Sequence, residues 1–350
     1  ARVRRSGGRR GEAAHGHGDE SMSRAMRSLE RGPTRHHDRP AAPRPVAKVE
    51  ACLSLPPRTP KQPDKNGLAI RSSGFTHVID KGMGLRQIED LISTASGYID
   101  IVKLGWGTGY VTQNVRQKVK LYHDAKIAVC FGGTLLEVAI LQGRFDSYCD
   151  MVEDLGMSYV EISNGVIDMT MGEKSRYIRA LRKRGFTVLS EVGSKDSEKI
   201  IPPFHWVELI KNDLKAGAWK VICEARESGT VGLYFSSGEA RAGLIDEIVR
   251  GVDGRADRLI FESPQRSQQI YMVRKLGSDV NLGNIATDDV IGLETLRLGL
   301  RGDTMPNFHL VDDWNREREA DLERELPQTK PQRRLKNVVA APTPPAWVRR

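Results

Sequence analysis

Short apolar runs in this 350-residue chain repeatedly end in an ionisable side chain. The runs are Val78–Asp80, Tyr159–Glu161, Leu189–Glu191, Val221–Glu224 and Leu259–Glu262. Carboxylates seldom lie inside strands unless they are paired or bind a metal ion. Several carboxylates in one place would repel one another unless a cation lay between them, and their hard oxygens suit Mg²⁺. The pattern therefore predicts that these side chains meet at one site, which Mg²⁺ could occupy.

The segment Leu189–Lys195 carries an acid at Glu191, breaks at Gly193 and ends on Lys195. Further cations and polar groups lie at the ends of the other runs. The full set of candidates is Asp80, Lys81, Lys103, Gly132, Gly133, Thr134, Glu161, Ser163, Asn164, Glu191, Lys195, Glu224, Arg226, Glu227, Glu262, Gly283 and Asn284. Any one acid could form a structural ion pair with a neighbouring lysine or arginine. Burying the whole set for structure alone would be costly, so the set predicts a functional site.

Two glycine-containing segments suggest phosphate binding. Gly132–Thr134 and Gly283–Asn284 each precede an expected helix, and the free amides at a helix start bind anions. We expect Thr134 to be the N-cap of its helix. Tight turns also require glycine, so a purely structural interpretation stays open. The sequence contains no Ser-His-Asp arrangement and no His-x-x-His motif, which argues against covalent hydrolase chemistry.

These groups would be positioned by strands that alternate with helices. The expected strands are His77–Asp80, Tyr98–Leu104, Ile127–Phe131, Tyr159–Ser163, Thr187–Val192, Lys220–Glu224, Leu259–Glu262 and Val280–Leu282. The expected helices are Leu85–Ala95, Val115–Tyr122, Leu135–Gln142, Phe145–Leu155, Glu173–Arg184, one through Trp206 and Leu214, Gly238–Val249, Gln268–Leu276 and Asp288–Leu300, the last capped by Thr287. Eight such repeats predict an α/β fold, a (β/α)₈ TIM barrel, whose active site lies at the carboxyl ends of the strands. An open doubly wound sheet is the alternative, but Gly82 and Gly84 lack the third glycine of a dinucleotide fingerprint.

Composition predicts three parts: a basic, disordered extension and proline-rich linker over residues 1–69, the catalytic barrel over 70–305, and a charged, then proline-rich tail over 306–350. The net charge of +9 comes mainly from the ends, because residues 1–50 have twelve Lys and Arg against six Asp and Glu. A basic arm can bind phosphate backbones without specificity, but this one has no interleaved aromatic residues. We therefore expect no specific nucleic-acid partner and a nearly neutral folded part.

The four cysteines are widely spaced and form no C-x-x-C pair. We expect reduced core thiols in a cytoplasmic protein, rather than metal ligands or disulfides. No stretch approaches the ~20 consecutive apolar residues of a membrane span, so no membrane association is expected. The sequence does not settle the oligomeric state; barrels often assemble, so a homo-oligomer is possible.

Between about Gly74 and Met305, motifs at nearly every expected strand end resemble those of the phosphosulfolactate synthase family. The matching segments are Asp80-Lys-Gly, Val102-Lys-Leu-Gly-Trp-Gly-Thr, Gly132-Gly-Thr, Val160-Glu-Ile-Ser-Asn-Gly, Leu189-Ser-Glu-Val-Gly-Ser-Lys, Glu224-Ala-Arg-Glu-Ser-Gly and Leu298-Gly-Leu-Arg-Gly-Asp-Thr. The chain departs from the family pattern at Asn164, where an aspartate is expected, and at Ser194, where a lysine is common.

The resemblance implies a Mg²⁺-dependent addition of sulfite to phosphoenolpyruvate that gives (2R)-3-phosphosulfolactate, a step toward coenzyme M. It implies that Lys195 is the proton donor, with a lowered pKa, and that carboxylates hold the metal. The implied metal ligands are Glu161, Glu191 and Glu224. Lys81, Lys103 and Arg226 would hold sulfite and the substrate carboxylate, and the amides of Gly283 and Asn284 the phosphate. Two alternatives stay open: a non-catalytic, stress-associated relative of the family, and an enzyme of this fold with another nucleophile or phosphorylated acceptor.

Overall fold

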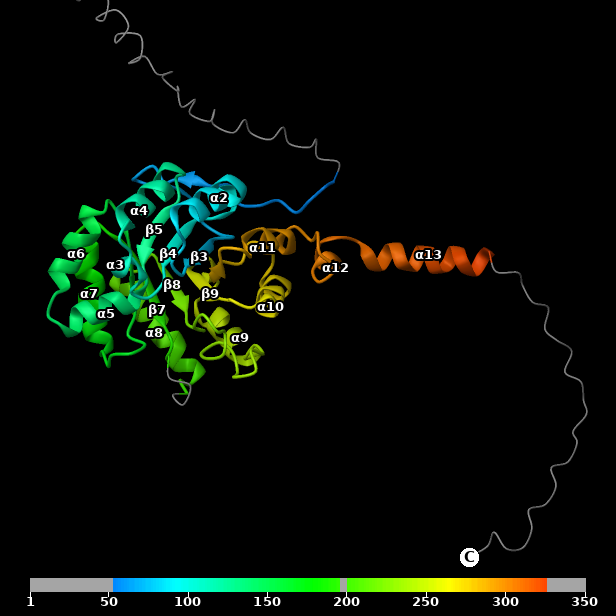
Figure 1. Ribbon diagram of the computed structural model, residues 1–350. Helices are drawn as coiled ribbons and strands as arrows, with labels where there is room; N and C mark the ends of the chain where they lie inside the picture. Colours follow the sequence, from blue (N-terminus) through cyan, green and yellow to red (C-terminus); the bar gives the residue numbers. More distant parts are fainter. Residues whose placement is uncertain (1–52, 196–199, 326–350) are drawn as a thin grey trace, which may run out of the picture. The chain divides into compact units, whose positions relative to one another are not determined.

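The computed structural model describes residues 53–195 and 200–325, with side chains up to residue 319 (Figure 1). The predicted disordered extension before residue 53 lies outside the described residues. The proline-rich end of the tail, after residue 325, also lies outside them.

The main sheet has eight parallel strands, hydrogen-bonded in the order β5-β4-β3-β10-β9-β8-β7-β6. The two strands at the ends of this order, β5 and β6, contact each other, so the sheet forms a nearly closed barrel. The strands are β3 Thr76–Asp80, β4 Ile101–Leu104, β5 Ala128–Phe131, β6 Tyr159–Ile162, β7 Thr187–Val192, β8 Lys220–Cys223, β9 Leu259–Glu262 and β10 Leu282–Ala286. The (β/α)₈ barrel is confirmed, and the open doubly wound sheet is wrong.

Helices follow the strands and surround them (Figure 1). Between β3 and β8 lie α2 Leu85–Ala95, α3 Thr108–Val111, α4 Val115–Asp124, α5 Gly133–Leu141, α6 Phe145–Asp154, α7 Met171–Lys183 and α8 Pro203–Ala216. After β8 come α9 Ala242–Gly251, α10 Arg266–Leu276, α11 Val290–Arg297, α12 Met305–Phe308 and α13 Val311–Glu325, and two 3₁₀ turns, η2 Ser96–Tyr98 and η3 Ala256–Arg258, precede β4 and β9. The larger core cluster lies between this helical layer and the strands.

A second core cluster fills the barrel interior with apolar side chains. It includes Ile101, Tyr159, Leu189, Ile222 and Ile260, each from a different strand. Side chains two residues apart on a strand point to the same face. The next inward-facing residues toward the carboxyl ends are Lys103, Glu161, Glu191, Glu224 and Glu262. The interior therefore changes from apolar to charged at the end of the barrel where TIM-barrel active sites lie.

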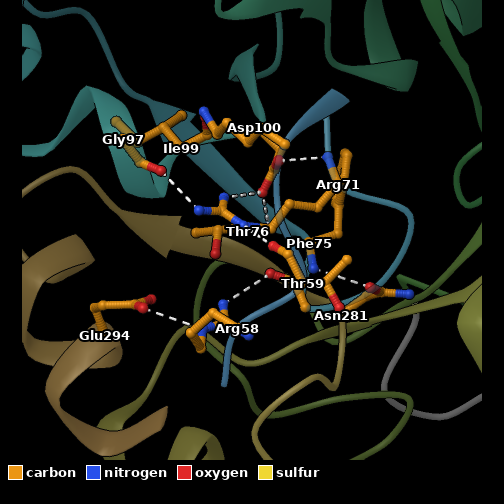
Figure 2. Close-up of polar contacts among 12 residues, drawn as sticks. Arg58, Thr59, Arg71, Phe75, Thr76, Gly97, Ile99, Asp100, Asn281 and Glu294 are labelled. Carbon is orange, nitrogen blue, oxygen red and sulfur yellow. Dashed lines mark hydrogen bonds and ion pairs between the residues drawn. The ribbon is translucent and has the colours of Figure 1, made fainter. Parts of the chain in front are cut away.

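The segment 53–75, which we call the strap, packs across the other end of the barrel and contains the short pair β1 Gln62–Pro63 and β2 Ala69–Ile70. Arg71 forms an ion pair with Asp100 at 3.1 Å, and Arg58 Nε lies 3.0 Å from Glu294 (Figure 2). From residue 53 on, the part predicted as a proline-rich linker instead packs against the barrel. The strap is held by partners distant in sequence, which local periodicity does not reveal.

Two predicted helix caps are wrong. Helix α5 begins at Gly133 after an extended Gly132, so Thr134 is not the N-cap. The Gly133 N–H donates to Glu161 Oε1 at 2.8 Å, so a carboxylate from the neighbouring strand satisfies that donor. Helix α11 begins at Val290 after Asp289, so Thr287 does not cap it.

The last strand also differs from the prediction. Strand β10 runs from Leu282 to Ala286, not from Val280 to Leu282, and its register shifts between Leu282 and Ile285. Gly283 and Asn284 therefore lie inside a strand and not in a turn before a helix. Because Gly283 has no side chain and Asn284 is polar, a search for runs of apolar residues misses this strand. Similarly, α9 begins at Ala242 and not at Gly238, which has a φ of 83° in a turn before the helix.

Other element ends also differ from the prediction: α7 begins at Met171 and not at Glu173, and α10 at Arg266 and not at Gln268. Tyr98 belongs to η2 and not to a strand, and the short helix α3 follows β4. The charged part of the predicted tail contains the helix α13, which begins at Val311.

None of the helices among the described residues is both long and apolar enough to cross a membrane. Cys130, Cys149 and Cys223 are buried free thiols, which confirms the prediction of core thiols for these three. Cys52 lies outside the described residues.

Candidate active site

A pocket opens at the carboxyl end of the barrel and gathers most of the predicted site residues. Its lining is Ile79, Lys103, Trp106, Gly132, Gly133, Thr134, Glu161, Glu191, Lys195, Glu224, Arg226, Glu227, Glu262 and Asn284. The four strand-borne glutamates are between 1% and 4% exposed. Four nearly buried carboxylates facing one pocket need cations close by, and the pocket supplies several.

Lys103 on β4 lies between two of the acids. Its Nζ is 3.5 Å from Glu161 Oε2 and 3.2 Å from Glu262 Oε1. Burial alone would lower the pKa of Lys103, but the surrounding glutamates outweigh it and raise that pKa well above its usual range. Burial raises the pKa of Glu161 to about 7, against the opposing charge of Lys103. Lys103 is therefore a permanent cation beside the pocket floor.

Lys195 binds the opposite pair of acids. Its Nζ lies 2.8 Å from Glu191 Oε1 and 3.5 Å from Glu224 Oε2. Burial would lower the pKa of Lys195, but the charges of Glu191 and Glu224 outweigh it and raise that pKa well above normal. The predicted lowering is wrong, because the charges of the neighbouring carboxylates outweigh the effect of burial.

The pKa values of the two acids that bind Lys195 are shifted in opposite directions. Burial and the charge of Glu191 raise the pKa of Glu224 well above its usual range. Burial acts the same way on Glu191, but Lys195 and a hydrogen bond with Glu224 outweigh it and hold that pKa below normal. Glu191 therefore ionises more readily than Glu224.

Three carboxylates could hold a metal ion. Ligand oxygens of Glu191, Glu224 and Glu262 all lie within 4.8 Å of one another. Glu224 Oε2 is buried and receives no hydrogen bond from the described residues. This oxygen-only set fits Mg²⁺. Glu161, predicted as the third ligand, instead groups with His77 and Cys130, and the geometry favours Glu262 in its place.

The turn after β8 fixes the orientation of two of these acids. The Ala225 N–H donates to Glu262 Oε2 at 2.9 Å, and the Arg226 N–H donates to Glu224 Oε1 at 2.6 Å. Each carboxylate thus keeps its other oxygen for Lys103 or Lys195. Glu262 was among the strand-end candidates, but sequence alone gave no reason to prefer it to Glu161.

Some candidates lie elsewhere. Lys81 is exposed and outside the pocket lining. Gly283 packs behind the pocket wall, where an added Cβ would lie 3.0 Å from the Ile260 side chain. Asp80 is buried in a structural ion pair, 2.8 Å from the ammonium of Lys118.

Three residues of the lining have strained backbones. Trp106, Arg226 and Asn284 have φ values of 51°, 61° and 53°, in the left-handed region that non-glycine residues avoid. Such strain persists where the surrounding structure enforces it, often at functional sites. The indole of Trp106 is 39% exposed at the pocket. The sequence motif contained Trp106, but no role was predicted for it.

Glu137 is a buried acid that sequence reasoning missed. It lies on α5 and accepts hydrogen bonds from the backbone N–H groups of Val166 and Ile167 at 2.9 and 2.8 Å. It also lies 3.9 Å from the Lys195 ammonium. Glu137 therefore connects α5, the loop after β6 and Lys195. An acid inside the otherwise apolar helix Gly133–Leu141 was the signal that could have found it.

Known proteins resemble this chain over the barrel. A family model described as (2R)-phospho-3-sulfolactate synthase (ComA) matches residues 65–303. A phosphosulfolactate synthase of Methanothermobacter thermautotrophicus is 42% identical over 260 residues, which are 73% of this chain and 97% of the relative. One of Bacillus subtilis is 44% identical over 254 residues, which are 72% of this chain and 97% of the relative.

Proposed function

Because the chain belongs to the phosphosulfolactate synthase family, we propose that it catalyses the Mg²⁺-dependent addition of sulfite to phosphoenolpyruvate. The product would be (2R)-phospho-3-sulfolactate, with the sulfonate on C3 and the phosphate kept on C2. One observation supports this most: a single pocket contains three clustered carboxylates, Glu191, Glu224 and Glu262, flanked by Lys103 and Lys195.

In this proposal Glu191, Glu224 and Glu262 hold Mg²⁺. The ion would supply positive charge that neutralises the three carboxylates and stabilises negative charge on the substrate carboxylate. Lys103, fixed between Glu161 and Glu262, adds a permanent cation beside the same position.

The reaction forms one carbon–sulfur bond and one carbon–hydrogen bond. The sulfite sulfur attacks C3 of phosphoenolpyruvate, and the C2=C3 electron pair moves into the carboxylate to give an enolate. The cations Lys103 and Arg226 line the pocket and would stabilise that charge as it develops. A proton then reaches C2 from one face, and no bond to the phosphate is broken.

Lys195 is the proton donor that we propose. It is cationic beside Glu191 and Glu224, so it enters the reaction carrying the proton. Gly165 packs over its side chain, since an added Cβ there would lie 2.9 Å from Lys195 Cγ. The ammonium is thereby directed into the pocket from one side, which accounts for a single configuration at C2.

The phosphate would lie near the start of α5. Thr134 lies in the first turn of α5, and it lines the pocket together with Arg226. The Gly133 N–H is already engaged by Glu161. We therefore propose Arg226 as the main phosphate ligand, in place of the amides of Gly283 and Asn284, and assign no role to Lys81, which lies outside the pocket lining.

The three buried free thiols fit a reducing compartment, and we propose that the enzyme acts in the cytoplasm.

The test is direct. Purified protein with phosphoenolpyruvate, sulfite and Mg²⁺ should consume both substrates and form the sulfonated product, detected by mass spectrometry. Lys195→Ala should abolish turnover, and Lys120→Ala, at an exposed lysine on α4, should not. Turnover with another nucleophile or phosphorylated acceptor would favour an enzyme with different substrates. Ligand binding without turnover of any acceptor would favour a non-catalytic relative.

A further inference from the structure

A second groove of about 410 Å³ lies at the amino-terminal end of the barrel, opposite the carboxylate pocket. The strap forms one wall and the starts of β6, β7 and β8 form the other. Its lining is Gln62, Pro63, Asp64, Ile70, Arg71, Ser72, Tyr159, Arg182, Thr187, Trp219, Lys220, Asp257 and Arg258. The proposed sulfite addition uses none of these residues.

Lys220 is the unusual member of this groove. It is 2% exposed, and its ammonium donates to the backbone oxygens of Ser72, at 2.7 Å, and of Asp257. The ammonium also lies 4.9 Å from the Trp219 ring centroid. No carboxylate among the described residues lies within 4 Å of it. Buried lysines are rare unless paired with an acid, and an ammonium has three donors, so one N–H of Lys220 remains without an oxygen acceptor among the described residues.

Two guanidinium groups on the same groove are also without an acid partner among the described residues. Arg258 donates only to the backbone oxygens of Trp219 and Ala218, and Arg182 only to that of Phe186. A guanidinium has five N–H donors, so each keeps several for a ligand. Arg71, by contrast, is paired with Asp100.

Among the described residues, no acid of the lining forms an ion pair with these three cations. Asp64 accepts a hydrogen bond from the Tyr159 hydroxyl at 2.9 Å, and the carboxylate of Asp257 is exposed. Three cations therefore lack an acid partner around one groove, and one of them is buried. A ligand with two negatively charged oxygens could partner both residues. It could accept two parallel hydrogen bonds from the Arg258 guanidinium and form an ion pair with the Lys220 ammonium.

We propose that this groove is a second ligand site, which binds a small oxyanion such as phosphate, or the phosphate group of a metabolite, between Lys220 and Arg258. Trp219 and Tyr159 would flank the ligand. The site joins the strap to the barrel, so the ligand would tighten that end of the fold. This inference does not rest on the proposed reaction.

The test uses the full chain with Arg226→Ala, which weakens phosphate binding at the carboxylate pocket. Titration calorimetry with inorganic phosphate should still show one site on this background. Adding Lys220→Met or Arg258→Gln should weaken that site at least tenfold. Lys61→Met is the control, because Lys61 is a half-buried lysine of this end that is also held by backbone oxygens, of Ser96 and Ile99, but lies outside the groove. It should leave phosphate affinity unchanged.

The proposal would be overturned if the Lys220 and Arg258 variants bound phosphate as tightly as the Arg226→Ala parent. It would also be overturned if the Arg226→Ala parent bound no phosphate. If Lys220→Met fails to fold, as judged by circular dichroism, Arg258→Gln decides the result. A glycerol phosphate titration distinguishes the two ligand sources. Tighter, Lys220-dependent binding of the ester supports a metabolite, and equal binding supports free phosphate.

Discussion

Lys195 Nζ lies 2.8 Å from Glu191 Oε1, although the strand that carries Glu191 has ended between them. Gly193 makes this possible. Its φ of 140° bends the chain just after the strand end, and an added Cβ would lie 2.3 Å from Glu224 Cβ. The relative positions of Glu191, Lys195 and Glu224, which follows β8, thus depend on Gly193.

Gly193→Ala should therefore damage both stability and activity. The new methyl group would displace the Glu224 side chain and force a left-handed alanine, so we expect a loss of more than about 1 kcal/mol in the free energy of unfolding. Misplacement of Glu224 and Lys195 should lower kcat by about 100-fold. Urea unfolding and steady-state kinetics measure the two effects. Gly243→Ala, in α9 with no atom within 4 Å of the added Cβ, is the control and should not be destabilised. Unchanged kcat in Gly193→Ala would contradict this account.

Much of this arrangement could be predicted from sequence, because inward-facing positions on strands follow period two. The apolar runs located seven of the eight strands, and two of them, Thr187–Val192 and Leu259–Glu262, with the structure's own bounds. The exception was β10, where a left-handed Asn284 and a register shift interrupt the apolar pattern.

The sequence could not show that Glu262 is a better candidate than Glu161 for the third metal ligand, because both residues follow apolar residues at equivalent strand positions. What separates them is the turn after β8, whose amides orient Glu262, and the Gly133 amide, which engages Glu161. These contacts join residues 37 and 28 positions apart. The strap was missed for the same reason.

Metal affinity should distinguish the two acids. Glu262→Gln removes a charge from the three-carboxylate cluster and should weaken Mg²⁺ binding by about tenfold or more. Glu161→Gln keeps that cluster intact and should weaken it much less. Titration calorimetry with Mg²⁺ on both variants is the measurement. A larger loss for Glu161→Gln would return Glu161 to the ligand set and remove Glu262.

Backbone strain and side-chain function can be separated at Trp106. Glycine accepts the φ of 51° without cost, whereas alanine does not, so Trp106→Gly should be more stable than Trp106→Ala by about 1 kcal/mol. If the indole contacts the substrate, both variants should raise the KM for phosphoenolpyruvate to a similar extent. Trp106→Phe should raise this KM less, because it keeps an aromatic ring. Urea unfolding and initial rates provide the two readouts. A KM that stays at the wild-type value in Trp106→Ala would show that the indole does not contact the substrate.

The pH dependence of the free energy of unfolding should show whether the pKa of Lys220 is lowered in the folded protein. Burial lowers the pKa of Lys220 from 10.5 to about 8, with Asp257 and Asp100 opposing this and Arg258 assisting it. Between pH 8 and 10.5 the unfolded chain therefore binds a proton at this residue that the folded chain does not. Raising the pH through this range favours folding, so the wild type should gain stability relative to Lys220→Met, on the order of 3 kcal/mol at most. Urea midpoints in phosphate-free buffer measure this gain, and parallel curves for the two proteins would show that Lys220 keeps an ordinary pKa. Added phosphate should reduce the gain, because an anion beside the ammonium raises its pKa again.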